Sequence, residues 1–174
     1  MRAINITGKH NIDKINEIGN ESYKAVRKNM GNLAEALLGQ PYQLDMLRNL
    51  YIIGPDYSEA NTSLFLSELN QKIQSYKGQD VKKEIHDPAS LITLEAVLEK
   101  LVASQLTCGY CSKPISVLYK NVRDPQQWTL DRIDNAVGHT RENTCIACLK
   151  CNLQRRVINF EKFTFTKKLK IQKL

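Results

Sequence analysis

The feature that most constrains this chain is the spacing of its cysteines. All five of them, Cys108, Cys111, Cys145, Cys148 and Cys151, lie after residue 107, and two CxxC pairs at 108–111 and 148–151 are separated by 36 residues. Two CxxC turns can place four thiolates about 2.3 Å from one tetrahedral Zn²⁺. An odd, clustered set of cysteines favours metal binding over a disulfide framework. The sequence therefore predicts a structural zinc site, with buried free thiols or redox pairs as the alternative.

Cys145 leaves the ligand set ambiguous, because it also forms a CxxC pair with Cys148. It lies in the apolar run 145–147, where a cysteine can be a small buried hydrophobic residue. Cys148 and Cys151, in contrast, bracket the expected start of a helix. We therefore expect the zinc ligands to be Cys108, Cys111, Cys148 and Cys151.

Positive charge is concentrated in the same part of the chain. Residues 108–174 contain 13 Lys/Arg against 5 Asp/Glu, whereas residues 1–107 contain 12 against 13. This asymmetry predicts a polyanionic partner for the C-terminal part, with a solvated basic face as the alternative. No segment approaches the roughly 18 unbroken apolar residues that span a bilayer. The N-terminus lacks the apolar segment of a signal peptide, so we expect an intracellular protein with no membrane partner.

The hydrophobic pattern predicts an α+β chain. Apolar residues recur at helical spacing over 11–38, 42–52, 62–77 and 93–105. Gly78 predicts the end of the third helix, and the polar stretch 79–88 predicts a linker. Short strands are expected at 115–119, 128–130 and 145–147, and a helix near Cys151. We expect a helical region over 1–88, of a role that the sequence does not reveal, and a zinc-bound domain over 89–174 with a leading helix and a basic tail.

The segment between the cysteine pairs carries the most specific motif. It reads Leu-Asp131-Arg132-Ile-Asp134-Asn, then Gly-His139, then Glu-Asn143, and after Cys148-Leu-Lys-Cys151 it continues with Asn152. Over residues 108–158 the chain resembles the zinc-containing subgroup of HNH endonucleases, a type associated with phages and large DNA viruses. The resemblance implies a ββα-metal, treble-clef-like domain and a metal-dependent endonuclease or nickase acting on DNA.

The resemblance also implies roles for individual residues. A nuclease that uses one divalent ion needs oxygen ligands that leave coordination positions open for water and phosphate. Asp131 and Asn152 match the family positions that hold this ion, which would be Mg²⁺ or Mn²⁺. Asn143 matches the asparagine that braces the loop and orients the general base.

One position departs from the family pattern. Arg132 stands where the family has its general-base histidine, and arginine is a poor base because it stays protonated. Three interpretations remain open. Asp134 or His139 activates the water, Arg132 stabilises charge in the transition state, or the module binds nucleic acid without cutting it. For each of these two candidate bases there is also a non-catalytic interpretation: Asp134 as a turn cap and His139 as a surface or phosphate contact.

Basic residues near the C-terminus predict the nucleic-acid surface. Lys150, Arg155 and Arg156 lie on or beside the expected C-terminal helix. Lys167 and Lys168 lie in the tail. We expect all five side chains to contact phosphates. We expect Phe160, Phe163 and Phe165 to pack onto the helical half. The main alternative function is a catalytically silent zinc module that binds nucleic acid in packaging, replication or transcription. A protein-interaction adaptor with the zinc domain as scaffold is a third.

Overall fold

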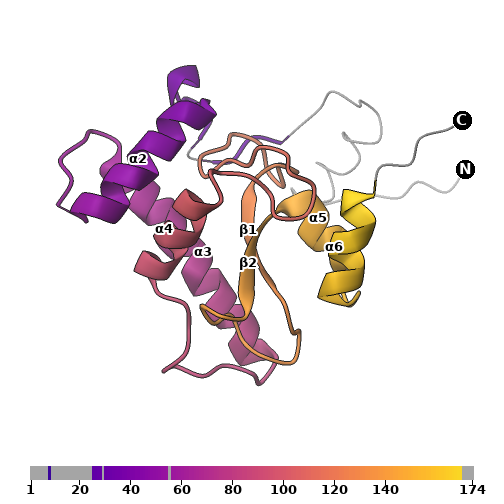
Figure 1. Ribbon diagram of the computed structural model, residues 1–174. Helices are drawn as coiled ribbons and strands as arrows, with labels where there is room; N and C mark the ends of the chain where they lie inside the picture. Colours follow the sequence, from indigo (N-terminus) through magenta and orange to yellow (C-terminus); the bar gives the residue numbers. More distant parts are fainter. Residues whose placement is uncertain (1–7, 9–24, 29, 55, 170–174) are drawn as a thin grey trace, which may run out of the picture.

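A computed structural model describes Gly8 and residues 25–28, 30–54 and 56–169, and it has a mixed α+β architecture. Figure 1 shows the two strands standing between helices α2–α4 on one side and α5 and α6 on the other. The order of elements is η1 (Glu35–Leu38), α2 (Gln40–Ile53), α3 (Thr62–Lys82), α4 (Leu94–Ala103), β1 (Trp128–Arg132), β2 (Thr144–Cys148), α5 (Leu149–Arg155) and α6 (Phe160–Lys168).

Local sequence signals explain where most helices begin and end. Pro41 lies in the first turn of α2, where a missing N–H costs nothing, and Gly54 ends the helix with a φ of 87°. Thr93 caps α4 by accepting a hydrogen bond from the backbone N–H of Ala96. Asn159 caps α6 in the same way through the N–H of Lys162.

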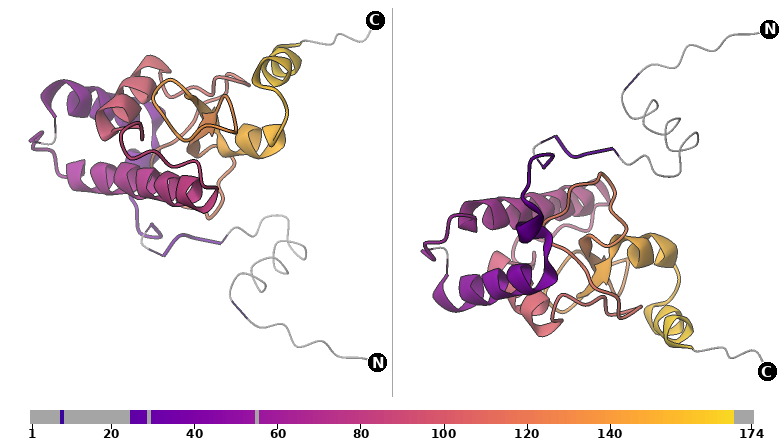
Figure 2. Two further views of the ribbon diagram at one scale, coloured as in Figure 1. Left: turned by 90° about the horizontal axis from the view of Figure 1, so that it is seen from below. Right: turned by 90° about the horizontal axis from the view of Figure 1, so that it is seen from above.

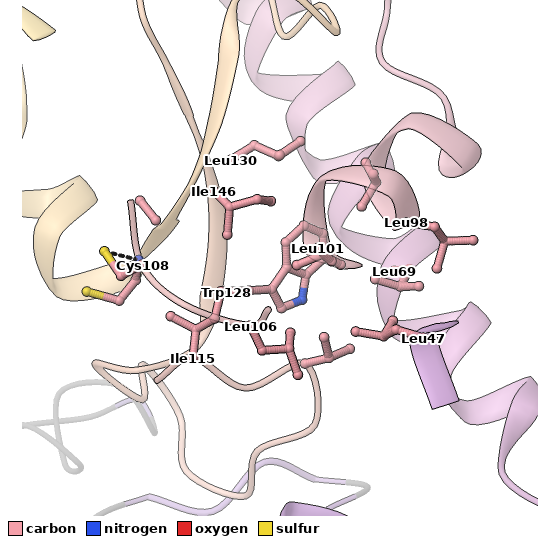
Figure 3. Packing of buried hydrophobic residues seen from close by; sticks show 14 of the residues in the cluster. Leu47, Leu69, Leu98, Leu101, Leu106, Cys108, Ile115, Trp128, Leu130 and Ile146 are labelled. Carbon is pink, nitrogen blue, oxygen red and sulfur yellow. Dashed lines mark hydrogen bonds between the residues drawn. The ribbon is translucent and has the colours of Figure 1, made fainter. Parts of the chain in front are cut away.

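The two strands form an antiparallel hairpin-like sheet in which Trp128 lies opposite Cys148 and Arg132 opposite Thr144. Helix α5 follows β2 directly, so residues 128–155 have a ββα order. Trp128 is fully buried at the centre of a hydrophobic cluster that runs from α2 to α6. Figure 3 shows it among leucines of the helices on one side and Ile115, Ile146 and Cys108 on the other. The boundary expected near residue 88 thus lies in a loop between elements that share one core.

Two expectations about local structure were wrong, and a third was wrong over the residues that the structure describes. Helix α3 does not end at Gly78 but continues to Lys82, because Asp80 is buried against the loop before β2. Residues 115–119 form no strand, only one isolated bridge, between Ser116 and Gln127. Of the helix expected over 11–38, residues 11–24 lie outside the described part of the chain. The described remainder holds a bridge from Val26 to Asn121, turns and η1.

Helix α6 packs on the cysteine-bearing module rather than on the helical half. The ring of Phe163 meets that of Tyr110 edge-on at 4.9 Å between centroids, and Phe160 lies 5.7 Å from the same ring. Phe165 is 66% exposed, so its expected packing is also wrong. Figure 2 shows α6 on the side of the sheet opposite to α2 and α3.

Within the described residues, none of the helices is both long enough and apolar enough to cross a bilayer.

Candidate functional site: a four-cysteine cluster beside a basic groove

Four of the five cysteines come together at the junction of β2 and α5. The Sγ atoms of Cys108, Cys111, Cys148 and Cys151 all lie within 4.8 Å of one another. Those of Cys111 and Cys148 are 3.9 Å apart, close to the roughly 3.8 Å that separates sulfurs around a tetrahedral zinc. The cluster can therefore hold a metal ion with the four ligands expected from the sequence.

The first CxxC turn is shaped by its contact with β2. The N–H of Gly109 donates to the carbonyl of Ile146 at 3.0 Å, and a Cβ at Gly109 would lie 3.2 Å from that oxygen. Glycine therefore allows the turn to approach the strand closely. A hydrogen bond from the Cys148 thiol lowers the pKa of Cys108 to about 4, and the same hydrogen bond raises the pKa of Cys148, so of these two sulfurs Cys108 carries the thiolate.

Cys145 lies outside the cluster. Its thiol donates to the hydroxyl of Tyr110 over 3.5 Å, and burial raises its pKa to about 11. It is therefore a neutral thiol that packs beside the site, as the apolar run around it indicated.

Asp131, on β1, is held in a buried ion pair. Its Oδ2 accepts hydrogen bonds from Nε of Arg155 and from the hydroxyl of Tyr110, both at 2.6 Å, and its Oδ1 accepts one from Nη2 of Arg155 at 3.1 Å. Asp131 is 6% exposed and Arg155 is 1% exposed. The arginine expected on the nucleic-acid surface thus lies in the interior, where its charge balances the carboxylate.

Asn152 lies on α5 beside the free edge of β1. Its amide nitrogen donates to Oγ1 of Thr129 at 3.1 Å and to the carbonyl of Leu130 at 3.2 Å. From the opposite side, the hydroxyl of Tyr76 on α3 accepts a hydrogen bond from the N–H of Leu130 at 2.9 Å. Helices α3 and α5 therefore meet the same strand edge from two sides.

An open groove of about 700 Å³ runs along this edge, and we call it the α3–β1 groove. Four of the expected catalytic residues line it: Asp131, Arg132, His139 and Asn152. Its lining also includes Lys72, Lys83, Arg123 and Arg156. Among the described residues, Asp131 is the one acidic side chain that lines the groove. Because Arg155 neutralises Asp131, the groove is strongly positive, which suits a polyanion.

Arg132 places an unsatisfied guanidinium at this groove. The side chain is 7% exposed, and Nη1 has no hydrogen-bond partner among the described residues. Its nearest counter-charge is Oδ1 of Asp80, 3.7 Å away. A buried charged donor without a hydrogen-bond partner is costly, so an additional acceptor at this position would be favourable.

His139 also lines the groove and is fixed by Asp80. Its Nδ1 lies 2.7 Å from Oδ1 of Asp80, and its backbone N–H donates to Oδ2 at 2.7 Å. The imidazole stacks on the ring of Tyr76 at 4.6 Å between centroids. Burial lowers the pKa of His139 below its usual value, although the hydrogen bond that the ring donates to Asp80 opposes that shift. The ring is therefore neutral near pH 7.

Asn143 and Asp134 organise the loop between the strands. The Asn143 amide donates to the carbonyls of Asp134, Val137 and Gly138, and its oxygen accepts the N–H of Asp134. Asp134 is exposed and accepts the N–H of Ala136. Asn143 thus braces the loop, whereas Asp134 caps a turn and does not line the groove.

The remaining basic residues are distributed unevenly. Arg156 lines the groove and is exposed, and Lys150 is exposed on α5. Lys167 donates to Oε1 of Gln154 at 2.5 Å, and Lys168 is exposed at the end of α6. Arg156 is thus the one nucleic-acid candidate of the sequence, among the described residues, that shares the groove with Asp131 and Asn152.

Sequence reasoning missed the contribution of α3 to this site. Asp80 was assigned to a linker, and Lys72 carried no motif. Lys72 lies 4.8 Å from the centre of the Trp128 ring and 5.2 Å from that of Tyr119. Burial, and then the charge of Arg27, lower its pKa to about 7. One signal was available in the sequence. Lys72 and Asp80 each lie four residues from Tyr76, so the two polar side chains share the helix face that this apolar ring buries.

Comparison of the chain with protein-family models, with curated proteins and with solved structures gave no significant match. The resemblance to HNH endonucleases therefore rests on the residues themselves.

Proposed function

We propose that this protein binds nucleic acid, most simply DNA, in the α3–β1 groove and hydrolyses a phosphodiester there. The observation that carries the proposal is the buried guanidinium of Arg132, which has an Nη1 without a hydrogen-bond partner among the described residues, in a groove lined by four further basic side chains. Phosphate oxygens would supply the hydrogen-bond acceptors that this guanidinium lacks and would add negative charge to that of Asp80, 3.7 Å away.

A structural zinc ion at Cys108, Cys111, Cys148 and Cys151 would support this groove from behind. The cluster joins the segment before the sheet to the start of α5, which carries Asn152. A bound ion would fix α5 relative to β1, and a site on rigid supports keeps its geometry. The expected role of zinc is thus structural rather than catalytic.

Asp131 and Asn152 offer oxygen donors, the type of ligand that hard divalent cations such as Mg²⁺ or Mn²⁺ prefer. The amide nitrogen of Asn152 is tied to β1, which leaves its Oδ1 for a ligand, and Oδ1 of Asp131 accepts only one hydrogen bond. Such an ion would lower the pKa of a bound water and offset charge on the phosphate. It would have to share the Asp131 carboxylate with Arg155.

That ion pair favours a second candidate function, nucleic-acid binding without cleavage. A carboxylate already neutralised by a buried arginine attracts a cation less than a free one does. In this alternative Arg132 and its neighbours bind the phosphate backbone, and Asp131 is structural.

Two measurements on the full-length protein separate the candidates. Fluorescence anisotropy with a labelled duplex, in EDTA, measures binding, which should weaken steeply with salt through counterion release. Incubation with supercoiled plasmid and Mg²⁺ or Mn²⁺ measures cleavage as nicked or linear product. Binding without cleavage in either metal supports the silent module. Absence of binding contradicts both candidates and leaves only a zinc scaffold.

Variants of Asn152 sharpen the cleavage test. Asn152→Ala should abolish cleavage while zinc content and duplex affinity persist, and Asn152→Asp should retain part of the activity because it keeps an oxygen ligand. Asn70→Ala, on the exposed face of α3, is the matched control and should behave as wild type.

A further inference from the structure

We propose that His139, rather than Arg132, is the general base for hydrolysis in the α3–β1 groove, and that Asp80 of α3 is the positioning residue that holds it. This inference rests on the proposed hydrolysis and extends it to the helical half of the chain. It gives α3 a part in the chemistry.

The hydrogen bonds of the Asp80 carboxylate go to His139. The carboxylate is 1% exposed, and its two oxygens accept the backbone N–H and Nδ1 of His139, each at 2.7 Å. Because an ionised carboxylate can only accept, Nδ1 carries the proton of the neutral ring. Nε2 is then an unprotonated nitrogen, which has no partner among the described residues and belongs to a side chain that lines the groove.

The chain is built to allow this contact. A Cβ at Gly138 would lie 2.8 Å from the carbonyl of Ile85 and 3.1 Å from Oδ2 of Asp80, so the loop can approach the end of α3 only with glycine there. The backbone of His139 is fixed further by its carbonyl, which accepts the N–H of Ile92 at 2.8 Å. Stacking on Tyr76 fixes the plane of the ring.

The neighbouring residues divide the chemical roles. Arg132 stays charged and lies beside the same carboxylate, where it can stabilise a phosphate but cannot remove a proton. His139 is neutral and oriented, as a general base must be. In the proposed step, Nε2 of His139 takes a proton from water as its oxygen bonds to phosphorus. The bond from phosphorus to the leaving oxygen breaks, and that oxygen takes a proton from solvent.

The test uses full-length protein on supercoiled plasmid with Mn²⁺, with duplex affinity and zinc content measured on each sample. Asp80→Asn is nearly isosteric, and its amide can donate to Nδ1, which would move the ring proton to Nε2. The expected result is a loss of about 10²- to 10⁴-fold in cleavage rate without any loss of duplex affinity, because the change removes a negative charge beside Arg132. Glu84→Gln, on the exposed turn after α3, is the matched control and should cut as wild type.

His139→Ala keeps the proposal testable if Asp80→Asn fails to fold. It should lose cleavage to a similar degree, and added imidazole should restore part of it, which a merely structural histidine would not show. Wild-type rates in Asp80→Asn, or in His139→Ala without imidazole, would overturn the proposal while hydrolysis stands. A wild type that binds duplex but never cuts would overturn the hydrolysis and, with it, this role of Asp80.

Discussion

The guanidinium of Arg155 donates two hydrogen bonds to the carboxylate of Asp131, at 2.6 and 3.1 Å, inside the module that joins β1 to α5. The sequence presented these residues as a metal ligand and a phosphate contact. Their pairing connects the strand to the helix and makes Asp131 a structural residue whatever else it does.

Breaking this pair should destabilise the protein strongly. Asp131→Ala leaves the charge of Arg155 buried without a partner, and such changes cost about 3–5 kcal/mol. Urea denaturation measures the loss in free energy of unfolding. Adding Arg155→Met should recover part of it, because the second change removes the orphaned charge. Glu99→Ala, which breaks the exposed pair with Arg141, should change stability little. A fully stable Asp131→Ala variant would contradict this account.

The metal ligands are tested by elemental analysis of single cysteine variants. We expect one zinc per chain, lost in Cys108→Ser and in Cys151→Ser, because each removes one of four thiolates. Cys145→Ser should retain the metal, since its side chain points to Tyr110. Chelation should unfold the cysteine-bearing part, which would be seen as loss of near-UV circular dichroism from Trp128. Zinc lost from Cys145→Ser but kept by Cys151→Ser would reverse the assignment.

Arg132 should bind phosphate directly. Arg132→Gln is expected to weaken duplex binding for all sequences alike and to reduce the slope of log affinity against log salt by about 0.9, the effect of one lost phosphate contact. The measurement is anisotropy at several salt concentrations. Arg141→Gln removes a charge that lies outside the groove, so its slope should match that of wild type. Equal slopes for both variants would argue against Arg132 as a phosphate ligand.

Duplex affinity should fall as the pH rises through neutrality. The pKa of Lys72 is about 7, lowered by burial and by Arg27 and partly restored by Glu68, so this lysine is charged below pH 7 and neutral above it. His139 is neutral across most of this range, because its pKa lies below the usual value. Titrating affinity between roughly pH 6 and 8 should therefore show weaker binding at high pH, and Lys72→Gln should flatten the curve. A wild-type curve as flat as that of the variant would exclude Lys72 from the interface.

The sequence by itself determined the features that depend on short-range pattern. Two CxxC turns identified the four residues that cluster, and apolar spacing identified α2, α4 and most of α3. These succeed because a thiolate site and a helical face are each specified by residues a few positions apart. The same locality explains the errors at Gly78 and at residues 115–119, where contacts from distant segments overrode the local signal.

Only the tertiary structure decided which residues meet across long separations. Asp80 pairs with His139 over 59 positions, and Tyr76 meets Leu130 over 54, and neither contact has a signature within its own segment. Arg155 and Arg156 are adjacent in sequence, yet the turn after α5 buries the first against Asp131 and exposes the second in the groove. The packing of whole elements decides which charged side chain is buried, because the cost of desolvating a charge is offset when another element supplies an oppositely charged partner.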